Sequence, residues 1–258
     1  MSTTLTDAGV LITGGTSGLG AETARAFAAS GARVVIAGRS AQKGVALAAE
    51  LGTNATYVQA DVTNEQQVAA AVAAASSAPK GLRLAVSAAG VATVAKTLGR
   101  DGSPHPLPPF EQMLRVNLVG AFNLLRLAAA SMANNEPNED GTRGVVVLTS
   151  SVGAYDGQMG QVGYAASKGG IVSMVLPAAR DLARSGIRVN AIAPGVFDTP
   201  FMDILSDEAK AGLAASIPHP SRLGKASEYA SLVGHIAYNP MLNGETIRLD
   251  GALRLGMK

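Results

Sequence analysis

Short β-branched runs alternate with longer, alanine-rich segments along almost all of the 258 residues. The runs that we expect to be strands are residues 10–13, 33–37, 56–60, 82–87, 145–149, 187–192 and 245–249. Strands that alternate with helical segments of about 10 to 15 residues are typical of βαβ units, and nearly continuous apolar strands indicate helices on both faces. The sequence therefore predicts an α/β fold, a single Rossmann-type, doubly wound, parallel sheet of seven strands formed by residues 1–258.

Two irregular stretches interrupt this alternation. Residues 96–110 contain four prolines and two glycines, so we expect an inserted surface loop. Residues 195–219 form the long connection after the sixth strand. Because ligands of open parallel sheets lie outside the carboxyl ends of the strands, this connection is a candidate substrate lid.

Composition excludes several classes of site. The chain has no cysteine, which rules out disulfides, thiol catalysis and zinc-thiolate centres. Its net charge is +2 and its basic residues are scattered, so we expect no nucleic-acid partner. His105, His219 and His235 do not have metal-ligand spacing, so we predict no metal. The first nine residues lack a signal pattern and no apolar run reaches about 18 residues, so we expect a cytoplasmic protein without a membrane partner.

A glycine-rich turn follows the first expected strand. It has the sequence Thr-Gly-Gly-Thr-Ser-Gly-Leu-Gly over residues 13–20 and opens the first expected helix. Glycines allow a backbone to approach a pyrophosphate closely, and the helix N-terminus directs N–H groups at the phosphates. The groups that we expect to bind a dinucleotide here are Gly14, Thr16, Ser17, Gly18, Leu19 and Gly20.

The end of the second strand indicates which dinucleotide is bound. A carboxylate at this place accepts hydrogen bonds from the ribose of NAD, whereas an arginine accommodates the 2′-phosphate of NADP. The chain has Gly38-Arg39-Ser40 and no carboxylate. Arg39 could also be a solvated loop charge and Ser40 a helix cap. The sequence favours NADP(H), contacted by Arg39 and Ser40, and NAD(H) is the alternative.

A second motif lies after the fifth strand. Ser151 is followed by Tyr164 and Lys168, whose spacing of four places both side chains on one face of a helix. A carbonyl that accepts a hydride also needs a proton, and tyrosine can donate it only if its pKa falls from about 10 toward the working pH. A nearby ammonium group favours the phenolate and lowers that pKa.

The spacing Gly-x3-Gly-x-Gly together with Ser…Tyr-x3-Lys resembles the short-chain dehydrogenase/reductase family over essentially the whole chain. The resemblance implies an oxidoreductase that acts on CH–OH groups, with Ser151, Tyr164, Lys168 and Asn117 as catalytic residues. Asn117 would hold a water-mediated proton path to Lys168. Lys168 and Tyr164 would also contact the dinucleotide. Further dinucleotide contacts that it implies are Asp61, Val62, Ala89, Gly90, Pro194, Gly195, Val196, Phe197 and Thr199.

Within that family the chain is most similar to the type 2 3-hydroxyacyl-CoA dehydrogenases. The segments that carry this likeness are residues 95–97, 135–137, 157–161, 220–224 and 243–251. That branch has Asp where Gly38 stands and uses NAD. Two functions therefore stay open: NADP(H)-dependent reduction of a hydrophobic ketone or 3-oxoacyl substrate, which Arg39 favours, and NAD-dependent oxidation of 3-hydroxyacyl-CoA. A dinucleotide sensor without activity is a remote third, because Tyr164 and Lys168 are both present.

The lid mixes large apolar side chains with the acidic residues Asp203, Asp207 and Glu208. Apolar area lines most small-molecule pockets, whereas carboxylates repel CoA phosphates, so the lid favours a neutral, hydrophobic carbonyl or alcohol. The residues that we expect to contact substrate are Ser151, Gln158, Tyr164, Phe197, Phe201 and Leu205. An apolar stripe after Lys168 is either core or an oligomer contact, and the resemblance implies a homotetramer formed through this helix; the stripe comprises Ile171, Val175, Ala179 and Leu182.

Overall fold

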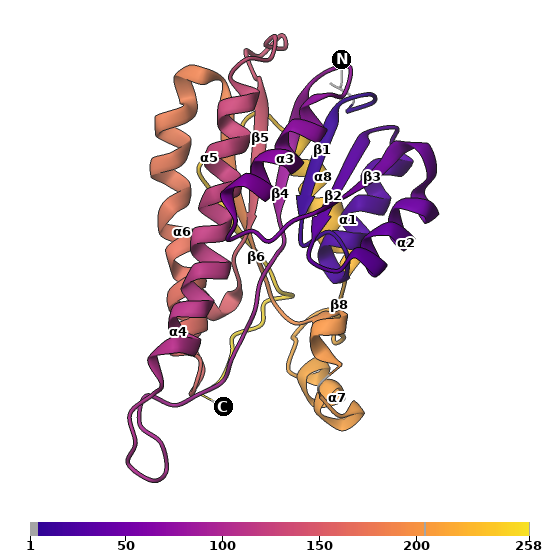
Figure 1. The fold of residues 1–258 in the computed structure, drawn as a ribbon. Helices are drawn as coiled ribbons and strands as arrows, with labels where there is room; N and C mark the ends of the chain where they lie inside the picture. Colours follow the sequence, from indigo (N-terminus) through magenta and orange to yellow (C-terminus); the bar gives the residue numbers. More distant parts are fainter. Residues whose placement is uncertain (1–4, 204, 258) are drawn as a thin grey trace.

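A computed structural model describes residues 5–203 and 205–257. Seven parallel strands form the main sheet in the order β3-β2-β1-β4-β5-β6-β9 (Figure 1). They are β1 Gly9–Thr13, β2 Arg33–Gly38, β3 Ala55–Gln59, β4 Leu82–Ser87, β5 Gly144–Thr149, β6 Ile187–Pro194 and β9 Thr246–Leu249. The predicted fold class, a Rossmann-type sheet between helices, is confirmed.

Helices cover both faces of this sheet because its strands are apolar on both sides. One face packs against α3 Glu65–Ser76, α5 Gly120–Met132 and α6 Val162–Leu182. The other packs against α1 Gly18–Ala29, α2 Ala41–Leu51 and α8 Ala226–Tyr238. Every residue of β5 and β6 is buried, as a central pair of strands with two covered faces requires.

The strand order reverses at β1, which pairs with β2 on one side and with β4 on the other. The helices that follow β1 and β4 lie on opposite faces of the sheet, so a crevice opens between these two strands at the carboxyl edge. The glycine-rich turn follows β1 and residues 88–91 follow β4, and both lie at this crevice. The fold therefore brings the two expected dinucleotide-binding segments together.

The insertion is a loop only as far as Pro106. An isolated bridge joins Leu98 to Pro104, and the helix α4 Leu107–Met113 begins directly afterwards. The prediction of a loop to residue 110 was therefore wrong for its last four residues. Pro108 lies in the first helical turn, where a missing N–H costs nothing because that group has no partner within the helix.

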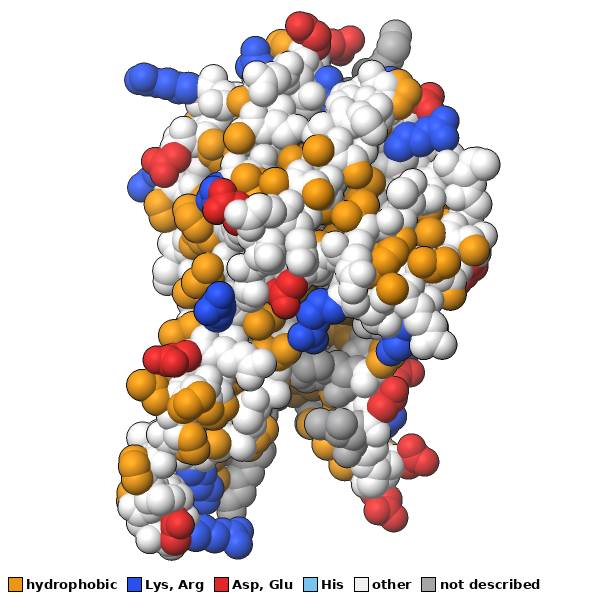
Figure 2. Space-filling view, in the orientation of Figure 1, with side chains coloured by type: hydrophobic (Ala, Val, Ile, Leu, Met, Phe, Trp, Pro, Cys, Tyr) orange, Lys and Arg blue, Asp and Glu red, His pale blue; other side chains and the backbone are white. Residues whose placement is uncertain are grey.

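The lid contains short elements of its own. They are β7 Phe197–Asp198, the 3₁₀ turn Pro200–Met202, α7 Asp207–Ala215 and, just beyond, β8 Gly224–Lys225. β7 and β8 pair as a separate two-stranded sheet. The insertion and α7 project beyond the same edge of the main sheet, on either side of a cleft (Figures 1 and 2).

One expectation about the helices is wrong. The stripe of Ile171, Val175 and Ala179 is buried in the core, with Leu182 packed against it, so it is no oligomer contact. The helical run from Leu107 to Met132 is long and apolar enough, by length and composition alone, to span a membrane. Half of its most apolar stretch is buried in the protein, and it packs against α3, α6 and β4 as a core helix does.

Candidate active site

The glycine-rich turn touches the segment after β4 backbone to backbone. Gly14 has a φ of +70°, and a Cβ atom there would overlap the amide nitrogen of Ala89. A Cβ atom at Gly20 would overlap the carbonyl oxygen of Gly14, so glycine is required at both positions. Ser17 begins α1 without a side-chain cap, which leaves the first N–H groups of the helix free of a side-chain partner. This cradle fits the pyrophosphate of a dinucleotide.

Thr16 and Gly38 are complementary in shape at the end of β2. A Cβ atom at Gly38 would lie 2.8 Å from Cγ2 and 3.2 Å from Oγ1 of Thr16. The threonine side chain therefore occupies the space that a larger residue 38 would need. Ser40 accepts a hydrogen bond from the Lys43 amide (3.4 Å) and caps α2. Helix capping is the role that the sequence indicated as the alternative to a dinucleotide contact.

Asp61 and Val62 lie between β3 and α3. Asp61 Oδ1 accepts hydrogen bonds from the amide (2.8 Å) and the hydroxyl (2.7 Å) of Thr63. These bonds, and more weakly the charge of Arg39, hold the pKa of Asp61 below its ordinary value. Val62 is buried, and its carbonyl accepts a bond from Asn123 (3.0 Å). The aspartate is thus a charged group close to Arg39, at the edge of the site.

The structure brings Ser151, Tyr164 and Lys168 together. Ser151 follows β5, and the other two lie one turn apart on α6, with Lys168 Nζ 5.9 Å from the centre of the Tyr164 ring. A Cβ atom at Gly153 would lie 3.4 Å from both Ser151 Oγ and Tyr164 Cε1, which shows how closely these side chains approach. A serine hydroxyl, a phenol and an ammonium group therefore meet at the carboxyl edge of the sheet.

Asn117 lies in a π-helical turn, residues Leu114–Val119, between α4 and α5. Its Oδ1 accepts a bond from the Val91 amide (2.8 Å), and its Nδ2 donates to the Val91 carbonyl (2.9 Å) and to Ser167 Oγ (3.0 Å). π-Turns are rare and often mark functional sites. With these three bonds, the Asn117 side chain positions the segment after β4 against the catalytic helix.

Burial dominates the titration of the central pair. Lys168 is 5% exposed, and desolvation lowers its pKa to about 8. Burial also raises the pKa of Tyr164, against a smaller lowering by its hydrogen bond to Ser151. The depressed tyrosine pKa that we expected is therefore absent from this geometry. The cause is the burial of the phenol. Lys168 Nζ itself donates to the Thr149 carbonyl (2.8 Å) and lies 5.9 Å from the centre of the Tyr164 ring.

Several residues around Lys168 escaped the sequence analysis. Ser150 Oγ donates to the Lys168 carbonyl (2.9 Å), and the Thr149 hydroxyl shares a buried hydrogen bond of 2.6 Å with Tyr229 OH. Two hydroxyl residues directly before Ser151 are a local signal that could have been used. Tyr229 comes from α8, 80 residues away from Thr149, and nothing near it in the sequence marks it.

The start of the lid lies against the glycine-rich turn. A Cβ atom at Gly18 would lie 3.3 Å from Cβ of Thr199, so Thr199 lies beside the glycine-rich turn. Pro194 ends β6, and the Val196 carbonyl accepts the Gly224 amide (2.9 Å). Phe197, by contrast, is 7% exposed and packs in the core beside Gly224. Its expected role as a substrate contact is therefore wrong, because β7–β8 pairing turns the ring inward.

The remaining substrate candidates lie on two segments. Gln158 is partly buried, and its Oε1 accepts a bond from Gln161 Nε2 (3.1 Å). Leu205 is partly buried in the lid. The side chain of Phe201 lies outside the described part of the structure. Within the described residues, no group of three or more His, Asp or Glu side chains is placed to hold a metal ion.

Comparisons with known proteins agree with this geometry. A family model described as short chain dehydrogenase matches residues 8–210. The chain is 50% identical over 246 residues to a 3-hydroxyacyl-CoA dehydrogenase type-2 of Drosophila melanogaster, covering 95% of this chain and 96% of the relative. It is 49% identical to the Homo sapiens protein of the same name, covering 95% and 94%. A crystal structure of 3-hydroxyacyl-CoA dehydrogenase type-2 from Mycobacterium avium aligns with a TM-score of 0.95, 45% identity and 98% coverage of both chains.

The lowered pKa of Lys168 predicts a pH dependence of stability. Between pH about 8 and the ordinary lysine value of 10.5, the folded protein has lost a proton that the unfolded chain still binds, so stability rises with pH. Relative to Lys168→Met, the wild type should gain unfolding free energy across this interval, measured by denaturant titration without cofactor. Parallel curves of unfolding free energy against pH for the two proteins would show that the pKa of Lys168 is not lowered.

Proposed function

Because this chain belongs to the short-chain dehydrogenase family, we propose that it interconverts 3-hydroxyacyl-CoA and 3-oxoacyl-CoA with a nicotinamide dinucleotide. Oxidoreduction at a CH–OH group follows from the family. The observation that carries the proposal is the meeting of Ser151, Tyr164 and Lys168 beside a glycine cradle that fits a pyrophosphate.

The residues that would hold the dinucleotide surround the crevice. The turn of residues 14–20 would take the pyrophosphate, Asp61 and Val62 the adenine side, and Lys168 and Thr199 the nicotinamide side. The bound dinucleotide would supply or accept the hydride. Glycines whose Cβ atoms would overlap neighbouring backbone support this placement, because no other residue leaves the cradle open.

The side chains of this protein would move the proton. In reduction, Tyr164 OH donates a proton to the substrate oxygen; in oxidation, its phenolate accepts the proton of the hydroxyl group. Ser151 Oγ holds the same oxygen by a hydrogen bond. Lys168 favours the phenolate when it is protonated, because opposite charges lower an acidic pKa. Asn117 keeps the segment after β4 in place beside Lys168.

The relatives favour a thioester as substrate over the neutral ketone that the lid composition suggested. Their name specifies 3-hydroxyacyl-CoA, and they match this chain over almost its full length. Figure 2 shows that the cleft lies between two projections. The insertion carries Lys96 and Arg100, neither of which forms an ion pair within the described residues. These two cations would bind the CoA phosphates on the side of the cleft opposite Asp207 and Glu208 of α7.

NADP(H) remains the preferred cofactor in this proposal, with NAD(H) as the alternative. The relatives' names do not specify a nucleotide, so the argument rests on this chain. Residue 38 is a glycine without a carboxylate, the Thr16 side chain lies against it, and Arg39 follows directly. A guanidinium group binds a phosphate with two charge-assisted hydrogen bonds.

We further propose that the enzyme is a homotetramer. Exposed apolar side chains on the outer surfaces of the α5 and α6 region support an interface there, namely Val119, Phe122 and Leu176. Apolar surface of this kind is typical of contacts between subunits. A cytoplasmic location stays a prediction.

The role of Tyr164 is testable by removing one oxygen atom. Tyr164→Phe should lower kcat by about 100- to 10,000-fold, because the general acid and base is lost. The dissociation constant of the dinucleotide and the melting temperature should stay near the wild-type values. Turnover within tenfold of the wild type would assign proton transfer to another group.

The cofactor preference is testable at Arg39. Arg39→Ala should weaken NADPH binding by about 10- to 150-fold, the effect of losing hydrogen bonds between charged groups, and change NADH binding less than about twofold. Fluorescence titration gives both constants, and Arg25→Ala on α1 is a matched control. A wild type that binds NADH more tightly than NADPH would contradict the preference.

The substrate class is testable through salt dependence. The ratio kcat/KM should be higher for acetoacetyl-CoA than for an uncharged aryl ketone, and should fall with ionic strength only for the thioester, because salt screens exposed charges. Lys96→Gln combined with Arg100→Gln should lower the thioester value and leave the ketone value unchanged, with Lys43→Gln as the control. Better turnover of the ketone at every salt concentration would restore the neutral-ketone hypothesis.

A further inference from the structure

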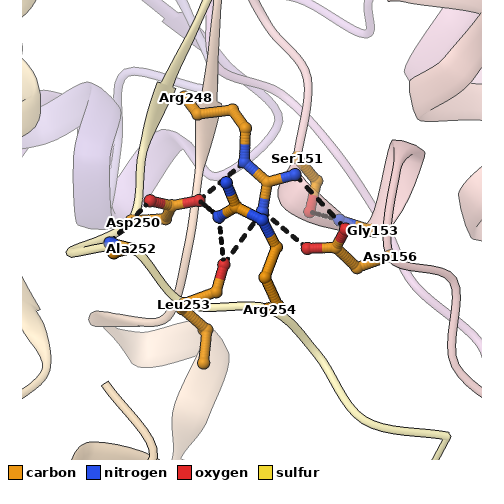
Figure 3. Close-up of polar contacts among 8 residues, drawn as sticks. All are labelled: Ser151, Gly153, Asp156, Arg248, Asp250, Ala252, Leu253 and Arg254. Atoms are coloured by element: carbon orange, nitrogen blue, oxygen red, sulfur yellow. Dashed lines mark hydrogen bonds and ion pairs between the residues drawn. The ribbon is translucent and has the colours of Figure 1, made fainter. Parts of the chain in front are cut away.

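Arg248, on β9, lies at the centre of a network that joins the segment after β5 to the chain that follows β9 (Figure 3). Its guanidinium group donates to both carboxylate oxygens of Asp156, at 2.5 and 3.3 Å. Its Nε donates to Asp250 Oδ2 (2.7 Å), and its Nη2 also donates to the Leu253 carbonyl (3.0 Å). Arg254 adds a weaker contact to Asp250 at 3.3 Å. One arginine thus connects two carboxylates and the chain that follows β9.

This network is partly shielded from water. The side chains of Arg248, Asp156 and Asp250 are 21%, 15% and 7% exposed, against 42% and 50% for the pair of Arg25 and Glu50 on the surface. Exposed ion pairs contribute little to holding a structure together. Partly buried ion pairs with a bidentate geometry and several hydrogen bonds hold the positions of their side chains more firmly than exposed pairs do.

Asp156 is connected to the catalytic serine by a single compact turn. The Asp156 amide donates to the Val152 carbonyl (2.9 Å), and Ser151 Oγ accepts from the Gly153 amide (3.1 Å). A displacement of Asp156 therefore moves the turn that carries Ser151. The same loop continues to Gln158, and the Met159 amide donates to the Met257 carbonyl (2.9 Å).

Asp250 is connected to the other side of the site. A Cβ atom at Gly195 would lie 2.8 Å from Cβ of Asp250, and the Gly195 amide donates to the Leu249 carbonyl (2.9 Å). The turn of Pro194 and Gly195 therefore rests directly on Asp250. The next residue, Gly251, accepts a bond from the His219 amide at the end of the lid (3.3 Å).

We propose that Arg248 is a positioning residue, which holds the Ser151 loop and the Pro194–Gly195 turn at a fixed separation by binding Asp156 and Asp250 at once. Ser151 is expected to hold the substrate oxygen, and the turn lies on the nicotinamide side. The distance between Ser151 and this turn then sets how closely the reacting carbon of the substrate approaches the hydride. The proposal rests on the function given above, and extends it to a residue outside the catalytic motif.

The test compares Arg248→Met, Arg248→Lys and Asp156→Asn with Arg25→Met, which breaks an ion pair far from the site. In Arg248→Met, kcat/KM should fall at least tenfold while the dinucleotide dissociation constant changes less than threefold. Arg248→Lys should recover part of the loss, and Arg25→Met should match the wild type. If Arg248→Met fails to fold, Asp156→Asn tests the same link.

The pH profile separates positioning from mere stability. The hydrogen bond between Ser151 and Tyr164 lowers the pKa of the phenol. If the serine is displaced, that pKa should rise, so the pH at which the rate of alcohol oxidation reaches half of its maximum should also rise. Lys168 is the other titratable group beside Tyr164, and no contact in the network reaches it. A lower melting temperature with unchanged kcat/KM and an unchanged profile would overturn the proposal.

A readout that needs no turnover distinguishes this proposal from the function on which it rests. Hydrogen exchange of the protein alone should accelerate in residues 151–161 of Arg248→Met and Asp156→Asn, and stay unchanged in Arg25→Met. An inactive wild type would refute the proposed function and leave this measurement valid. Unchanged exchange in residues 151–161 would refute the role of Arg248.

Discussion

A parallel sheet must be covered on both faces, and this constraint governs where the protein can perform chemistry. Helices occupy both surfaces of the seven strands, so polar groups can gather only at the edges of the sheet. All strands point the same way, and their carboxyl ends meet at one edge. The glycine-rich turn, the segment after β4, Ser151 and the lid all emerge there. The site is therefore a consequence of the topology before any particular side chain is considered.

Within that edge, the buried ammonium group of Lys168 organises its surroundings. Burial of a charge is costly without partners, and the partner of Nζ here is the backbone carbonyl of Thr149. The Thr149 carbonyl accepts a hydrogen bond from Lys168 Nζ, the Ser150 hydroxyl donates to the carbonyl of Lys168, and Tyr229 shares a hydrogen bond with the Thr149 hydroxyl. The lowered pKa of Lys168 follows from this arrangement, since none of these oxygens brings a full negative charge.

The sequence was sufficient for the parts of the structure that depend on local pattern. Strand and helix periods predicted the sheet, and spacing predicted that Tyr164 and Lys168 share a helix face. The sequence could not predict the interactions between segments that are distant along the chain. Tyr229 contacts Thr149 from another element, the β7–β8 pair turns Phe197 into the core, and the apolar stripe at Ile171 is buried rather than exposed. The pKa of Tyr164 is raised rather than lowered because the phenol is buried, and burial depends on segments that pack together from distant parts of the chain.

The fit between Thr16 and Gly38 also constrains how this site can change over evolutionary time. A Cβ atom at position 38 would lie 2.8 Å from Cγ2 of Thr16, so a larger residue there requires the threonine side chain to move. Loss of the threonine, in contrast, leaves Gly38 undisturbed. The two substitutions therefore have a preferred order, with position 16 becoming smaller first. A lineage in which residue 38 grows larger would therefore pass most easily through an ancestor with small residues at both positions.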